Sequence, residues 1–156
     1  MPMSISEDMG ETWSYSPSPF PPIGGGQRLV LLRLQEGPLF FASFTGENRK
    51  NPSATDVTDV VGQKRSVTGL FTAVSLDEGQ TWSNIRLVSH DGPDHQMETA
   101  NGHPFTMGMS TAELGGYLAG CQAPDGLIHL ISSKQHYTFN LTWLTTAPPE
   151  VEVMRG

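Results

Sequence analysis

This sequence is short of positive charge. Its 156 residues include 9 Lys and Arg against 16 Asp and Glu, which gives a formal net charge of −7 at pH 7. Without a cationic excess or a run of Lys and Arg, the chain lacks the bulk electrostatics that bind a nucleic-acid backbone or an anionic membrane surface. We therefore expect no nucleic-acid or membrane partner, and a ligand that is recognised locally.

Cysteine and long apolar runs are also scarce. Cys121 is the one cysteine, so no disulfide can form within the chain, and its expected role is that of a small apolar side chain. No apolar run approaches the ~20 residues that span a bilayer. The first ten residues lack the basic and apolar regions of a signal peptide. These features leave the compartment unassigned.

Helix-like patterns are nearly missing, whereas turn formers are abundant. The 17 Gly and 12 Pro bound short runs of β-branched, aromatic and aliphatic residues, which is typical of strands. We expect an all-β chain, with at most one helical turn near residues 109–114. The predicted strands cover residues 28–34, 39–44, 69–75, 84–89, 116–122, 127–133 and 137–144.

One octapeptide pattern occurs twice, as SEDMGETW at 6–13 and SLDEGQTW at 75–82. In such a turn the Asp can accept backbone hydrogen bonds, the Gly can take positive φ, and the Trp can cover the turn. The alternating oxygen ligands of a calcium loop are missing, so we expect structural turns and no metal or cofactor. The turn residues are Ser6, Asp8, Gly10 and Trp13, and Ser75, Asp77, Gly79 and Trp82.

A Ser-x-Asp-x-Gly-x-Thr-Trp hairpin repeated once per four-stranded unit resembles the Asp-box, or BNR repeat, of the sialidase superfamily. Residues 69–144 are also similar to the C-terminal half of bacterial sialidase-like proteins, which are often exported. The resemblance implies a β-propeller of four-stranded antiparallel blades, with a carbohydrate as partner.

The predicted strands divide the chain into about two blades. A partial blade covers 1–27, a full blade 28–89, a long loop 90–115, a second partial blade 116–146 and a tail 147–156. We expect the N-terminal strand to complete the last blade. Two blades cannot close a ring, because each leaves an open edge and an apolar face. A six-bladed ring would require either a longer protein or a homotrimer.

Functional groups are expected on the long connections opposite the Asp-box turns, because long loops on a rigid scaffold collect binding residues. Sialidases use a Tyr nucleophile paired with a Glu. The resemblance therefore implies Glu113 and Tyr117, near the start of a predicted strand, as catalytic residues. The alternative interpretation is a surface carboxylate and a packed strand aromatic.

Further loop residues have the chemistry to bind a sugar. Arginines can clamp a carboxylate, and a turn with an imidazole and a phenol can hold a sugar ring. Histidine spacings typical of zinc sites are missing. The predicted substrate-binding residues are Arg49, Arg65, His103, His136 and Tyr137. Two main hypotheses follow: a sialidase-like glycoside hydrolase acting on an acidic glycan, or a non-catalytic, lectin-like assembly. A structural interaction scaffold is a third.

Overall fold

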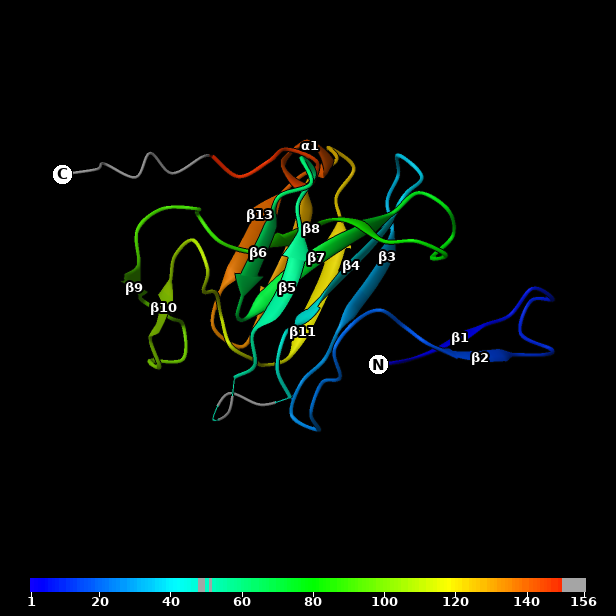
Figure 1. Cartoon of the computed structure of the whole chain (residues 1–156), viewed down its shortest axis with the longest axis horizontal. Coiled ribbons are helices and arrows are strands. Elements are labelled where there is room, and N and C mark those ends of the chain that lie inside the picture. Colours follow the sequence, from blue (N-terminus) through cyan, green and yellow to red (C-terminus); the bar gives the residue numbers. More distant parts are fainter. Residues whose placement is uncertain (48–49, 51, 150–156) are drawn as a thin grey trace.

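The chain is all-β apart from one short helix, and its strands form several antiparallel sheets, none of them closed in the described part of the chain. The computed structural model describes residues 1–47, 50 and 52–149. Two sheets form the body, and an N-terminal hairpin projects from it (Figure 1). No helix among these residues is long and apolar enough to cross a membrane.

The larger sheet has four strands in the order β3-β4-β7-β8. These are β3 (Val30–Arg33), β4 (Leu39–Phe44), β7 (Leu70–Ser75) and β8 (Ser83–Leu87). The two central strands, β4 and β7, are buried almost throughout, because side chains cover both of their faces. All four strands fall within runs that the sequence predicted, to within one or two residues at their ends.

The smaller sheet has three strands in the order β11-β12-β13. They are β11 (Leu118–Gln122), β12 (Ile128–Ser132) and β13 (His136–Phe139). One apolar core joins the two sheets, and the rings of Phe40 and Phe139 lie 5.9 Å apart within it. Gly120 permits this close packing, since a Cβ there would lie 3.2 Å from Val30 Cγ1.

The last predicted strand is too long. β13 ends at Phe139, and the helix α1 (Leu141–Leu144) follows where the sequence indicated a strand to 144. Asn140 begins this helix, because its side-chain oxygen accepts a hydrogen bond from Trp143 N at 2.9 Å. A cap-forming Asn therefore overrides the alternation of apolar residues around it.

The N-terminal segment corrects a second expectation. β1 (Pro2–Ile5) and β2 (Ser14–Pro17) pair with each other in a separate hairpin, and neither joins β13. The prediction that an N-terminal strand completes the last sheet within one chain is therefore wrong. The eight-residue turn brings its two flanking strands together locally, and in Figure 1 this hairpin lies far from β13.

Two further hairpins occupy the long connections. β5 (Thr55–Thr58) pairs with β6 (Lys64–Val67), and β9 (His95–Met97) pairs with β10 (Phe105–Met107). Their sequences are mostly polar, so hydrophobic alternation did not predict them. Each long connection therefore contains an antiparallel hairpin.

Both Asp-box turns have the same hydrogen bonds among their Ser, Asp, Gly and Thr residues. Gly79 N donates to Ser75 Oγ at 2.8 Å, and Thr81 N donates to an Asp77 carboxylate oxygen at 2.8 Å. In the first copy, Gly10 N donates to Ser6 Oγ at 2.7 Å and Thr12 N to Asp8 at 2.8 Å. Gly10 and Gly79 have φ angles of 97° and 83°, which a residue with a Cβ rarely adopts.

The two tryptophans of these turns have different surroundings. The Trp82 ring lies 5.2 Å from Phe20 and 5.6 Å from Phe41, on the face of the four-stranded sheet away from the main core. Trp13 is 63% exposed, and its Nε1 donates to Gly10 O at 3.1 Å. The turn therefore keeps one geometry with and without a covering sheet.

The other tight turns lie beside the second Asp-box. Gln35 N donates to Gln122 Oε1 at 2.7 Å, which joins the β3–β4 and β11–β12 turns. Arg33 forms an ion pair with Glu78, which joins β3 to the Asp-box turn. These short turns therefore share one end of the two-sheet body.

Acid should weaken both Asp-box turns. Hydrogen bonds from the Thr12 side chain and backbone, with one from Ser6, lower the pKa of Asp8 from 3.8 to about 2. Hydrogen bonds from Thr81 and Ser75 lower the pKa of Asp77 in the same way. Because a lowered pKa favours the folded state only while the carboxylate is ionised, this stabilisation is complete above pH 4 and is lost as the pH falls toward 2.

We expect Asp77→Asn to flatten the fall in melting temperature between pH 5 and pH 2.5, and to lower the melting temperature at pH 7. Asp8→Asn, in the detached hairpin, is the matched control and should change amide exchange only in residues 6–13. Thermal unfolding followed by circular dichroism, with hydrogen exchange, measures both. A wild-type-like acid transition in Asp77→Asn would contradict the assignment.

Candidate functional site

The backbone around Glu113 is fixed by the start of β7. Leu70 N donates to Glu113 O at 2.8 Å, and Ala112 N donates to Thr68 O at 2.9 Å. Gly69 makes this approach possible: its φ is 117°, and a Cβ there would lie 2.6 Å from Ala112 O. The segment before β11 is thereby held against the four-stranded sheet.

The Glu113 side chain is completely buried at the junction of the two sheets. Its Oε2 accepts a hydrogen bond from Ser132 Oγ at 2.5 Å and another from the Tyr137 hydroxyl at 3.0 Å. Burial, the charge of Glu113 and this hydrogen bond together raise the pKa of the Tyr137 phenol well above its ordinary value. Tyr137 therefore stays a neutral hydrogen-bond donor at physiological pH.

Tyr117 lies on the exposed side of the same junction. Its ring is 55% exposed, and the guanidinium carbon of Arg28 lies 5.1 Å from the ring centroid. Arg28 N donates to Gly116 O at 3.2 Å, which ties the chain just before β3 to the chain just before β11. A cation and a phenol therefore meet where these two neighbouring strands begin.

Gly116 separates the exposed phenol from the buried carboxylate. A Cβ on Gly116 would lie 3.3 Å from Glu113 Oε1 and 3.1 Å from Ser133 Oγ. Tyr117 N also donates a hydrogen bond to Ser133 Oγ at 3.1 Å. Arg28, Glu113 and Tyr117 thus form one cluster, which we call the strand-start cluster.

The residues predicted to bind a sugar carboxylate do not lie in the strand-start cluster. Arg65 lies on β6, where its Nε is 3.7 Å from a carboxylate oxygen of the buried Asp59. Arg49 lies outside the described residues. His103 is exposed between β9 and β10, and its carbonyl accepts a hydrogen bond from Lys134 Nζ at 2.5 Å. The structure therefore gives Arg65 and His103 local contacts apart from the strand-start cluster.

His136 and Tyr137 do not form the expected binding turn. Both belong to β13, and successive residues of a strand point to opposite faces, so they cannot contact one sugar ring together. Tyr137 faces Glu113, whereas the His136 imidazole lies 3.0 Å from that of His129 on the outer face. The error was to include His136 and Tyr137 in the turn after Gln135, whereas β13 already begins at His136.

Arg28 is the residue that the sequence interpretation missed. It begins the predicted strand 28–34, and Tyr117 lies at the start of the predicted strand 116–122, so the two occupy similar places in the two sheets. Comparing strand starts, instead of searching long loops, would have paired them. Ser132 and Ser133, which position Glu113 and Tyr117, carry no such signal.

A cavity of about 540 Å³ lies on the other side of Tyr137, along β13. Its lining is mainly apolar and aromatic, and none of the described residues around it is Arg, Lys, Asp or Glu. Within the described part of the chain, no three His, Cys, Asp or Glu side chains are arranged to hold a metal ion. No family model, curated protein or solved structure matches this chain.

Proposed function

We propose that this chain carries part of a sialidase-like glycoside hydrolase site, centred on the strand-start cluster and acting on a glycan with a carboxylate group. The observation that supports it is the Arg28 guanidinium 5.1 Å from the exposed Tyr117 ring, beside the buried Glu113 carboxylate. Arg28 provides the charge that orients a sugar carboxylate, because a guanidinium can bind it through two hydrogen bonds.

Tyr117 is the proposed nucleophile. Its oxygen would form a bond to the anomeric carbon, while the glycosidic bond breaks and the leaving oxygen takes a proton from water. A second water would then form a bond to the anomeric carbon as the bond to Tyr117 breaks, which releases the sugar and returns a proton to the phenol. The phenol proton would pass to water, because Gly116 separates the exposed Tyr117 from the buried Glu113, and Glu113 would fix the chain just before Tyr117. Tyr137 and Ser132 hold the Glu113 carboxylate in place and are positioning residues.

The proposed scaffold is a β-propeller in which the two packed sheets are neighbouring blades. Three features support it: two antiparallel sheets of similar strand order sharing a core, an Asp-box turn between β7 and β8, and a second between β1 and β2. In such an arrangement β3 and β11 are the innermost strands, and Arg28 and Tyr117 face a central channel.

Hydrolysis of a fluorogenic sialoside and uronide panel tests the catalytic assignment. We expect Tyr117→Phe to lower kcat at least 100-fold, and Arg28→Ala to raise KM for substrates with a carboxylate. Tyr137→Phe should lower kcat less, and Tyr15→Phe, on the exposed hairpin, is the control that should match the wild type. Activity that survives in Tyr117→Phe would exclude it as the nucleophile.

A second candidate function is lectin-like glycan binding without cleavage. The contacts of Glu113 favour it, since Ser132 and Tyr137 both donate to the same carboxylate oxygen in the sheet interior. Binding on a glycan array that is lost in Arg28→Ala, with no product released from the same glycans, would support this function over hydrolysis.

A further inference from the structure

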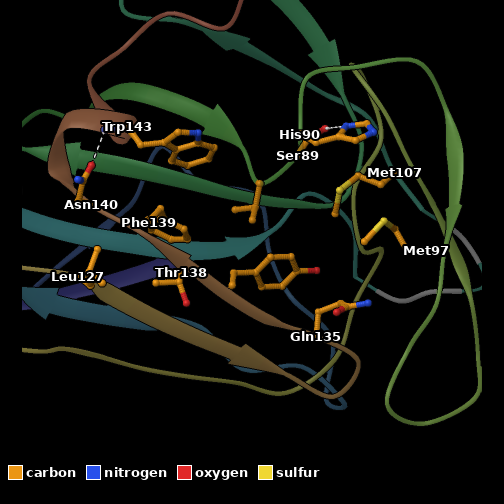
Figure 2. Close-up of a pocket in the computed structure, with 12 residues that line it drawn as sticks. Ser89, His90, Met97, Met107, Leu127, Gln135, Thr138, Phe139, Asn140 and Trp143 are labelled. Carbon is orange, nitrogen blue, oxygen red and sulfur yellow. Dashed lines mark hydrogen bonds between the residues drawn. The ribbon is translucent and has the colours of Figure 1, made fainter.

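The cavity along β13 follows a strand edge instead of a sheet face. Gln135 and the consecutive residues 137–140 line one side, and Met97 and Met107 line the opposite side (Figure 2). Side chains of consecutive strand residues point to opposite faces, so a cavity that contacts all of them runs beside the strand. We call this cavity the β13 groove.

The β13 edge offers backbone groups for another strand. Ser132 N donates to Gln135 O at 2.8 Å, and the register pairs Leu130 with Tyr137. In an antiparallel pair, the alternate residues His136 and Thr138 then direct their N–H and C=O groups away from β12. β13 is the last strand of its sheet in the described chain, so no strand of this sheet uses these groups, and Thr138 is the one of the two residues that lines the groove.

In the larger sheet, the outer edge of the third strand is occupied by a fourth strand. There β7 pairs with β4 on one side and with β8 on the other, and β7 and β8 flank an Asp-box turn. β13 has only β12 as its described partner, whereas the hairpin β1–β2 carries the other Asp-box turn. By this comparison β2 corresponds to β8, and the β13 groove is the place for such a strand.

The N-terminal hairpin has an exposed strand and acidic side chains, and both can contribute to docking. All of β2 is exposed, with Tyr15 at 77%, and both hairpin strands lie outside the two-sheet body (Figure 1). The groove is lined by Met97, Met107, Phe139 and Trp143, which suits an aromatic side chain. The hairpin's charged side chains, Glu7, Asp8 and Glu11, are all acidic.

None of the described residues that line the groove would repel that charge. His90 lines the groove, and its Nε2 lies 2.6 Å from His95 Nδ1. No acidic side chain lines the groove among the described residues. The acidic turn of the hairpin would therefore meet a lining without carboxylates.

We propose that the β13 groove binds β2 of a second copy of this chain. The partner's β2 would extend the sheet to the order β11-β12-β13-β2-β1, with the partner's Tyr15 against the apolar lining. Because donor hairpin and acceptor groove are different surfaces, the contact is head-to-tail and repeats until a ring closes. This interface is separate from the strand-start cluster and does not depend on its activity.

Sedimentation velocity of the full chain tests the interface. We expect the wild type to sediment as an oligomer and Thr138→Pro as a single protomer, since Pro removes one outward N–H and leaves the pairing with β12 intact. Thr138→Val keeps the N–H and the side-chain shape, so it should remain oligomeric. A wild type that stays a single protomer up to its solubility limit would overturn the proposal.

A mixing experiment distinguishes a head-to-tail contact from a symmetric one. Tyr15→Ser alters only an exposed side chain, so it should fold normally and fail to associate through its hairpin. Thr138→Pro retains an intact hairpin, and Tyr15→Ser retains an intact groove. We expect each variant alone to be a protomer, and an equimolar mixture to form a dimer of one copy of each. Oligomers that persist in both single variants would refute the proposed pairing.

Discussion

Arg86→Met is expected to lower the free energy of unfolding by about 3–5 kcal/mol, because it leaves the Asp91 carboxylate buried without its counter-ion. Arg86 Nη2 lies 2.5 Å from Asp91 Oδ2, and the two side chains are only 6% and 7% exposed. The guanidinium also donates to Trp143 O at 3.0 Å and to Thr146 O, and lies 3.9 Å from the Trp143 ring centre. One side chain therefore joins β8, the loop after it and the end of α1.

Urea unfolding followed by tryptophan fluorescence measures this loss. Arg33→Met is the matched control: it removes the ion pair with Glu78, whose partners are 51% and 69% exposed, and it should leave the unfolding curve nearly unchanged. The double variant Arg86→Met with Asp91→Asn should recover much of the stability, since it leaves no buried charge alone and Asn tolerates the φ of 57° at this position. Equal losses in Arg86→Met and Arg33→Met would contradict this account.

Phe40→Ala should lower the free energy of unfolding by about 3–5 kcal/mol as well. Phe40 is completely buried on β4, and its ring faces Phe139 across the two sheets. The core between the two sheets sets the separation of β3 and β11, and removing the Phe40 ring opens a cavity in that core. Because Arg28 and Tyr117 are positioned by the starts of those strands, we expect glycan binding to weaken too.

The same urea titration, with glycan binding measured at 10 °C and 30 °C, tests both expectations. Phe40→Leu retains most of the volume and should lose about a third as much stability. Leu31→Ala, at an exposed position on β3, is the surface control. A Phe40→Ala protein as stable as Leu31→Ala would show that the two sheets do not share the core described above.

The strands of the two main sheets could be predicted because their apolar runs are bounded by strong turn signals. Both Asp-box octapeptides have side chains that define their own geometry, so pattern and structure agree there. The helix after β13 was missed because LTWL is as apolar as a strand, and only the Asn140 cap distinguishes it. The pairing of β1 with β2 was missed because a four-residue strand carries no information about which edge it joins.

The candidate site was predictable only in part. Glu113 and Tyr117 were selected because the sialidase resemblance implies a Tyr–Glu pair and both lie near the start of a predicted strand. The structure places both near the junction of the two sheets. Arg28 was not selected, because contact between residues 89 positions apart in sequence depends on how the two sheets pack. His136 and Tyr137 were grouped as neighbours in sequence, although β pairing separates their side chains by face.

The match between the two Asp-box turns has a consequence for the order of folding. One turn is covered by Phe20 and Phe41 and the other stands in water, yet their hydrogen bonds agree to within 0.1 Å for the Gly and Thr amides. A loop that reaches its final shape without neighbours needs no prior collapse of the chain. Hairpins close within microseconds, so both octapeptides can act as early nuclei, and β7–β8 can form before β4 arrives.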